Sequence, residues 1–234
     1  MMSAPLFDSK TIPVIFKAGL AIAISIVLVP VLNLNNIVFV EEIIPFGIGL
    51  AGEIILGIII GLSVKLVFAG IQLAGKLTGL QMGFAIADIL DPITSSQVSI
   101  TGQFNFLVAM LIFLIINAHH WFLIALAESF QLIPPFNFNF TTAIIEQIMI
   151  LAGNLFVIAV KVGAPVIAAL LITSVTMGLI ARTVPQMQIF IVAMPLKIIV
   201  GLLFLGLSLP YLSALLQQIY YDLGRDIFRI LNAI

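Results

Sequence analysis

The feature that most constrains this chain is a series of long apolar runs with almost no charge inside them. The runs cover about residues 14–34, 46–70, 104–127, 143–181 and 188–210, and only 8% of the 234 residues are charged. A soluble domain carries roughly a quarter, so these charges cannot cover a water-facing surface and lipid must be the main solvent. No alternating strand pattern recurs as a barrel would require. We therefore expect an all-α, polytopic membrane protein built of Gly-rich, kinked helical hairpins.

Composition also excludes several classes of function. The net charge of −1 argues against a nucleic-acid partner held through phosphates. The sequence contains no cysteine, which rules out disulfides, thiolate catalysis and cysteine-bound zinc. The first apolar run, from near Val14 to about Leu34, is too long for a signal peptide and long enough to span a bilayer. We interpret it as a retained helix.

The polar breaks between the runs predict a topology. Those near Lys10, Lys76 and Arg182 carry basic residues, whereas residues 33–42 and 129–141 contain no Lys or Arg. By the positive-inside rule, this alternation places the Lys10 end in the cytoplasm.

Three segments have a more specific helical pattern. The 143–181 run exceeds one crossing and contains Pro165, which predicts one bent helix or two short ones. Thr183-x-x-Gln186 fits a capping box at the start of a following helix. The tail is expected to be an amphipathic helix with apolar residues at Leu212, Leu215, Ile219, Leu223, Ile227 and Ile230. Its wetter side carries Asp222, Arg225, Asp226 and Arg229.

Enzyme chemistry finds no support in the residues. The two histidines, His119 and His120, are adjacent, and Glu128 lies about 12 Å further along a helix from His120. No His-Glu-x-x-His spacing, Gly-x-Ser-x-Gly motif, Walker motif or dinucleotide fingerprint is present. We expect no catalytic residue, metal or cofactor, and we interpret the histidines as markers of the membrane–water boundary.

Charges inside apolar runs are costly and indicate function by default. The residues in question are Glu53, Lys65, Glu146, Lys161 and Lys197. Glu53 and Lys65 are about 18 Å apart along a helix and cannot pair directly. For the lysines at 65 and 161, snorkelling near a helix end is as good an interpretation as function, whereas the shorter Glu53 favours a wet or paired site within an assembly.

Two groups of glycines, one pair and one set of three, each have a spacing of four residues. They are Gly57, Gly61, Gly75, Gly79 and Gly83, and on one helical projection they fall within about 80° of each other. Small residues at this spacing let helix backbones approach closely in lipid. They pack either within this chain or against neighbouring subunits, and we favour the subunits.

Four blocks of sequence, in order along the chain, resemble one family. They are Ser3-Ala4-Pro5-Leu6-Phe7 with Ile12-Pro13; Gly79-Leu80-Gln81-Met82-Gly83-Phe84 with Asp91-Pro92; Asn117-Ala118-His119 and Trp121 with Ser129-Phe130-Gln131-Leu132-Ile133-Pro134; and Arg182-Thr183-Val184-Pro185-Gln186-Met187-Gln188-Ile189-Phe190 with Pro195-Leu196-Lys197. Together they are similar to the FliR/SctT family of type III secretion export-apparatus subunits, with the flagellar FliR type the better match. The resemblance covers essentially the whole chain, which we treat as a single export-gate membrane domain over residues 1–234.

Two departures from the family pattern stand out. Members usually carry another hydrophobic helix before the Ser-Ala-Pro-Leu-Phe stretch, and that first helix is not in this sequence. Gln188 also stands where asparagine is common, a change that keeps the amide.

The resemblance implies a role in bacterial flagellum assembly. FliR-like subunits join FliP and FliQ in a helical assembly of the inner membrane and flagellar basal body. That assembly forms the entry conduit for unfolded flagellar proteins, with FlhB in contact and FlhA below. Much of it sits above the membrane plane, so hydropathy overcounts the spans. In the family, the segment after Gly-Leu-Gln-Met-Gly plugs the closed conduit, which implies a plug at about residues 84–100 here.

Such a gate needs a wall that seals without sticking, made of apolar and adaptable side chains. Met82, Phe84, Ile86 and Ile89 can supply a pliable seal. Gly79 and Gly83 would allow hinge motion or close packing at its root, Asp91-Pro92 would restart the helix, and residues from Gln81 to Phe84 would line the throat. The resemblance assigns Arg182, Pro185, Gln186, Phe190, Pro195 and Lys197 to the family's most specific motif.

Other functions remain open. The nearest is the homologous subunit of a virulence injectisome, which has different cargo. A proton-coupled small-molecule transporter using Glu53 or Glu146 would predict inverted repeats between the halves, and we find no convincing repeat. A scaffold without contact to the pore is the third.

Overall fold

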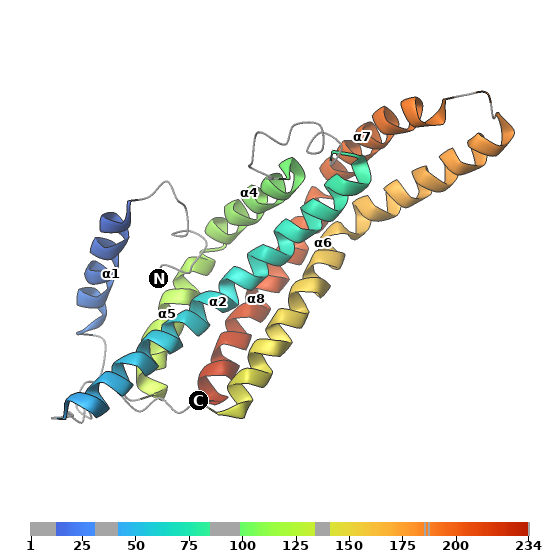
Figure 1. Ribbon diagram of the computed structural model, residues 1–234. Coiled ribbons are helices and arrows are strands. Elements are labelled where there is room, and N and C mark those ends of the chain that lie inside the picture. The colour runs from blue at the N-terminus through green and yellow to red at the C-terminus, as the bar shows by residue number, and fades with distance from the viewer. Residues whose placement is uncertain are drawn as a thin grey trace. The chain divides into compact units, whose positions relative to one another are not determined.

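The computed structural model describes residues 13–30, 42–84, 99–133, 141–184, 186 and 188–233. Within these ranges it contains seven helices and no strand, which confirms the all-α prediction. The helices are α1 (Val14–Leu28), α2 (Ile43–Met82), α4 (Ile100–Ile115), α5 (Ala118–Leu132), α6 (Thr142–Thr183), α7 (Ile189–Leu207) and α8 (Leu209–Ala233), as labelled in Figure 1.

The helices form two compact units, and each unit is assembled from segments far apart in the chain. Unit 1 comprises Met1–Phe68, Phe113–Gly153 and Gln218–Ile234, and unit 2 comprises Ala69–Ile112 and Asn154–Gln217. In unit 1, Ile59, Ile144, Leu151 and Ile230 form a buried apolar cluster. The prediction of one domain stays a prediction.

The two long helices, α2 with 40 residues and α6 with 42, are each apolar enough to cross a membrane. The predicted break near Lys76 is wrong, because α2 runs through this residue to Met82. The Lys76 side chain is exposed on the side of the helix, and no proline interrupts the backbone there. Lys76 therefore marks no loop, which removes one of the three basic breaks behind the topology prediction.

α6 is a single helix with Pro165 inside it, so of the two predicted alternatives, one bent helix or two short ones, the structure has the one helix. The predicted capping box at Thr183 is wrong. Thr183 is the last residue of α6, and its hydroxyl donates to the Ile180 carbonyl at 3.0 Å. The next helix, α7, begins only at Ile189.

The 104–127 run is not one helix but the bent pair α4 and α5, with an angle of 68° between them. Asn117 adopts a left-handed conformation (φ 57°) before α5, and asparagine is one of the few non-glycine residues that does so readily. A second bend of 56° separates α7 from α8 next to Pro210, which cannot donate a backbone hydrogen bond. The described residues thus offer two membrane-crossing helices, or four if each bent pair is one span.

α8 confirms the predicted amphipathic tail, although part of its apolar side is placed differently. Leu212, Leu223, Ile227 and Ile230 are buried as expected. Leu215 and Ile219 are half-buried, and their fully buried places are taken by the next residues along the helix, Leu216 and Tyr220. The ring of Tyr220 lies 5.2 Å from Phe113 and 5.9 Å from Phe68, centroid to centroid.

Candidate functional site

The end of α2 carries the predicted root of the plug, and its backbone explains why glycine is needed there. Gly83 has a φ of 96°, a conformation that L side chains rarely adopt. The Phe84 amide donates to the Gly79 carbonyl at 3.0 Å, and the Gly83 amide donates to the Leu80 carbonyl at 3.1 Å. These two bonds are the Schellman pattern, which satisfies the last carbonyls of a helix. Gly83 therefore ends α2.

Met82 belongs to the core of unit 2. It is fully buried in a cluster with Val166, Leu170 and Leu205, and Phe84 packs against this cluster. A Cβ built on Gly201 would lie 2.5 Å from the Met82 Cε, so α7 has room for this methionine only because glycine stands opposite. In this conformation Met82 is enclosed by α6 and α7 of its own chain. Its contact with cargo in a throat stays a prediction.

Gln81, the residue before Met82, has a buried polar atom. The side chain is half-buried. Its Oε1 atom is buried with no hydrogen-bond partner among the described residues. A buried carbonyl oxygen without a donor is uncommon in folded proteins.

Gly75 and Gly79 lie where α2 crosses α4 in unit 2. A Cβ on Gly75 would lie 2.4 Å from the Gly102 Cα and 2.5 Å from the Thr101 carbonyl oxygen. A Cβ on Gly79 would lie 2.5 Å from the Thr101 Oγ1. The preference for subunit packing is therefore wrong at these two glycines, because the partner is another helix of the same chain.

The other predicted small residues of α2 have different surroundings. Gly57 has open space where a Cβ would be, so packing of a neighbouring subunit against it stays a prediction. Gly61 is buried. Sequence spacing alone could not distinguish these positions from Gly75, because it does not show which glycine has another helix packed against it.

Several predicted residues lie outside the described part of the chain or are only partly described. Ile86, Ile89, Asp91, Pro92 and Pro185 fall outside it. Phe190 lies in α7, but its side chain is not among the parts of the chain that the structure describes.

The remaining motif residues lie at the end of α6 and in α7. Arg182 is exposed in the last turn of α6, where the helix dipole stabilises a positive charge. Gln186 and Pro195 are exposed, and Lys197 is half-buried. Beside these residues in α7, Met194 reaches the end of α2, where its Cε lies 3.4 Å from the Cβ position of Gly83.

The charges predicted inside the membrane are mostly on the surface. Lys65, Glu146 and Lys161 are exposed, and Glu53 is half-buried. Glu53 and Lys65 each have an interaction with another group, so neither is free. Exposed lysines within apolar helices fit the snorkelling interpretation.

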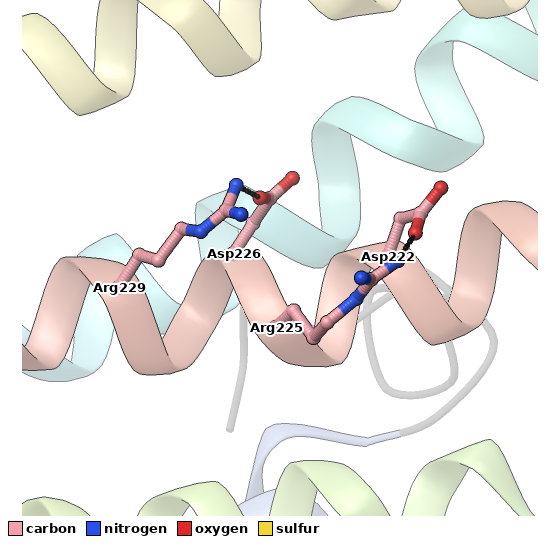
Figure 2. Close-up of polar contacts among 4 residues, drawn as sticks. All are labelled: Asp222, Arg225, Asp226 and Arg229. Carbon is pink, nitrogen blue, oxygen red and sulfur yellow. Dashed lines mark hydrogen bonds and ion pairs between the residues drawn. The ribbon is translucent and has the colours of Figure 1, made fainter.

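The charged side of α8 is organised as two ion pairs. Arg225 pairs with Asp222, and Arg229 donates to Asp226 at 3.2 Å; Figure 2 shows the four side chains along one side of the helix. Both arginines are about 70% exposed, at 71% and 68%. Surface pairs of this kind contribute little to stability. The described residues hold no cluster of three potential metal ligands, and the His119 and His120 rings simply pack 4.3 Å apart.

Sequence reasoning did not identify the hydroxyl residues Ser99 and Thr101 at the start of α4. The signal was present, because a serine directly before an apolar run is a typical helix cap. Its link to the glycines of α2 could not be found without knowing that the two helices cross.

α6 has a long outer side of unpacked apolar residues. Large exposed side chains occur from Met149 to Leu179, including Phe156, Val160 and Ile172. This stretch is about 45 Å long at 1.5 Å per residue. At an average tilt of about 20° it would still extend about 42 Å across a hydrocarbon core of about 30 Å.

Comparison with known proteins supports one family across the chain. Residues 1–223 match the family described as bacterial export proteins, family 1. The flagellar biosynthetic protein FliR of Pectobacterium carotovorum is 32% identical over 99% of this chain and 89% of its own length. The FliR proteins of Bacillus subtilis and Escherichia coli are 30% and 28% identical, each over 94% of this chain and over 85% and 84% of their own lengths.

Proposed function

Because the chain belongs to the bacterial export proteins, family 1, as a member of the FliR family of flagellar biosynthetic proteins, we propose that it is a subunit of the flagellar type III export gate. In this proposal it forms, with FliP and FliQ, the inner-membrane conduit for unfolded flagellar proteins in the basal body. FlhB and FlhA are the further partners. The relatives named above are all flagellar proteins, which favours this role over the injectisome alternative.

The observation that carries the proposal is the length of the apolar surface. The large exposed apolar side chains of α6 run from Met149 to Leu179, about 45 Å along the helix, and at an average tilt of about 20° they would extend about 42 Å across the membrane. Lipid covers about 30 Å of this. The rest of the exposed apolar surface requires protein, which fits a subunit packed among other apolar helices.

Co-purification tests the proposal. The chain, tagged at its C-terminus and extracted from native membranes in mild detergent, is expected to bring FliP and FliQ with it. An exposed-face variant such as Ile172→Asp is expected to reduce their recovery strongly, and Val14→Asp in α1 serves as a matched exposed position on another helix. Recovery of the chain without either subunit would contradict the proposal.

The plug prediction has its own test. Deletion of residues 84–90 in the assembled gate is expected to raise ion leakage across the membrane, because the apolar seal proposed for this stretch would be lost. Membrane conductance of cells that express the deleted gate measures it. A conductance equal to that of the intact gate, with the complex still assembled, would remove the plug from the proposal.

A further inference from the structure

The crossing of α2 and α4 contains a hydrogen-bond chain whose direction the structure fixes. The Thr101 Oγ1 lies 2.6 Å from the Gly75 carbonyl oxygen and donates to it. The Thr101 hydroxyl has one proton, so in its 3.0 Å contact with Ser99 the serine must be the donor. Ser99 in turn accepts from the Gly102 amide at 3.1 Å. The chain therefore runs from the Gly102 amide through Ser99 and Thr101 to the Gly75 carbonyl.

This hydrogen-bond chain both caps α4 and joins α4 to α2. Ser99 caps α4, because its oxygen accepts from the amide three residues later. Thr101 fastens that cap to the backbone of another helix, 26 residues away. Thr101 is buried, at 3% exposed, and Ser99 is half-buried. Hydrogen bonds in series strengthen one another where the dielectric is low.

Steric fit adds to the hydrogen bonds. The backbones meet at two glycines, Gly75 and Gly102, where an added Cβ on Gly75 would lie within 2.6 Å of three backbone atoms. Gly79, one turn further along α2, lies against both hydroxyl residues, at 2.5 Å from Thr101 and 3.2 Å from Ser99 for its Cβ position. The Gly79 carbonyl also accepts the Phe84 amide. The last described residue after α2, Phe84, is thus bonded to Gly79, and the first described residue before α4, Ser99, lies beside it.

We propose that this crossing is a fixed joint, locked by the Thr101 hydroxyl, which keeps the end of α2 and the start of α4 together whatever the intervening chain does. In this proposal α2 and α4 do not separate when the protein works. The joint is independent of the cargo and of the partner subunits proposed above.

Hydrogen–deuterium exchange tests the joint in the complex purified from membranes into nanodiscs. Thr101→Val keeps the shape of the side chain and removes the hydroxyl, so exchange of the amides in residues 99–105 and 79–84 is expected to rise about three- to tenfold. Thr101→Ser keeps the hydroxyl and is expected to remain close to the natural protein. Thr176→Val is the matched control, because Thr176 bonds only within its own helix, to the Ile172 carbonyl at 2.9 Å, and is exposed.

Gly75→Ala gives a second test that does not depend on the hydroxyl. The added methyl group would meet the α4 backbone and is expected to raise exchange over the same residues, even in a complex that assembles normally. Equal exchange in the natural protein, Thr101→Val and Gly75→Ala would overturn the proposal. A Thr101→Ser variant as labile as Thr101→Val would overturn the role of the hydroxyl.

Discussion

Gly83 and Gly178 differ in what their backbones require. Gly83 has a φ of 96°, whereas Gly178 lies inside α6 with open space where a Cβ would be. An L side chain in the left-handed region costs about 1–2 kcal/mol, but in a helix interior alanine is favoured over glycine. Glycine is thus favoured at position 83, where an L side chain would be strained, and is replaceable at position 178.

Gly83→Ala is therefore expected to lower the free energy of unfolding by about 1–2 kcal/mol. Thermal unfolding of the detergent-solubilised protein, followed by circular dichroism, measures the change. Gly178→Ala is the matched control and is expected to leave the midpoint unchanged or to raise it slightly. A Gly83→Ala midpoint as high as that of the control would contradict the assignment of Gly83 as the residue that ends α2.

At the scale of elements, α8 depends on its buried side rather than on its ion pairs. Tyr220 is 1% exposed and packs against Phe68 and Phe113 in unit 1. Tyr211, in the first turn of the same helix, is 50% exposed. Buried aromatic rings contribute far more than exposed ion pairs such as Asp222–Arg225.

Tyr220→Ala is expected to destabilise the protein by about 3–5 kcal/mol, the usual cost of removing a buried aromatic side chain. Tyr211→Ala, the control on the same helix, is expected to cost less than about 1 kcal/mol. The yield of folded protein after detergent extraction, together with its thermal midpoint, measures both. Equal losses in the two variants would show that the aromatic cluster does not hold α8.

The sequence predicted the helices better than their ends. The pattern of apolar residues identified α6 and the amphipathic α8. It could do so because an apolar run and an amphipathic pattern are both local properties of the sequence. It placed a break at Lys76, where a charged side chain simply lies on the outside of α2, and it missed the break at Asn117, where one residue changes the backbone. The core position of Met82 and the pairing of Gly75 with Gly102 could not be predicted, since each depends on which helix lies opposite.

At the scale of the whole molecule, the exposed apolar surface is larger than lipid alone can cover. Its charges are few, and the side of α6 from Met149 to Leu179 remains exposed over a length greater than a bilayer core. Lipid and this chain together leave apolar surface in contact with water. We therefore expect other subunits to cover α6 beyond the part that lipid covers.

Cysteine scanning along α6 tests this requirement most directly, because the sequence contains no cysteine and each introduced thiol is unique. Single cysteines are introduced at Met149, Phe156, Ile172 and Leu179, and one at the buried Val162 serves as the control. Each variant is treated in membranes with a water-soluble maleimide. We expect labelling at one or both ends of this series when FliP and FliQ are absent, and protection at all four positions when they are present. Protection at all four positions without FliP and FliQ would show that lipid alone covers α6 and that no other subunit is needed there.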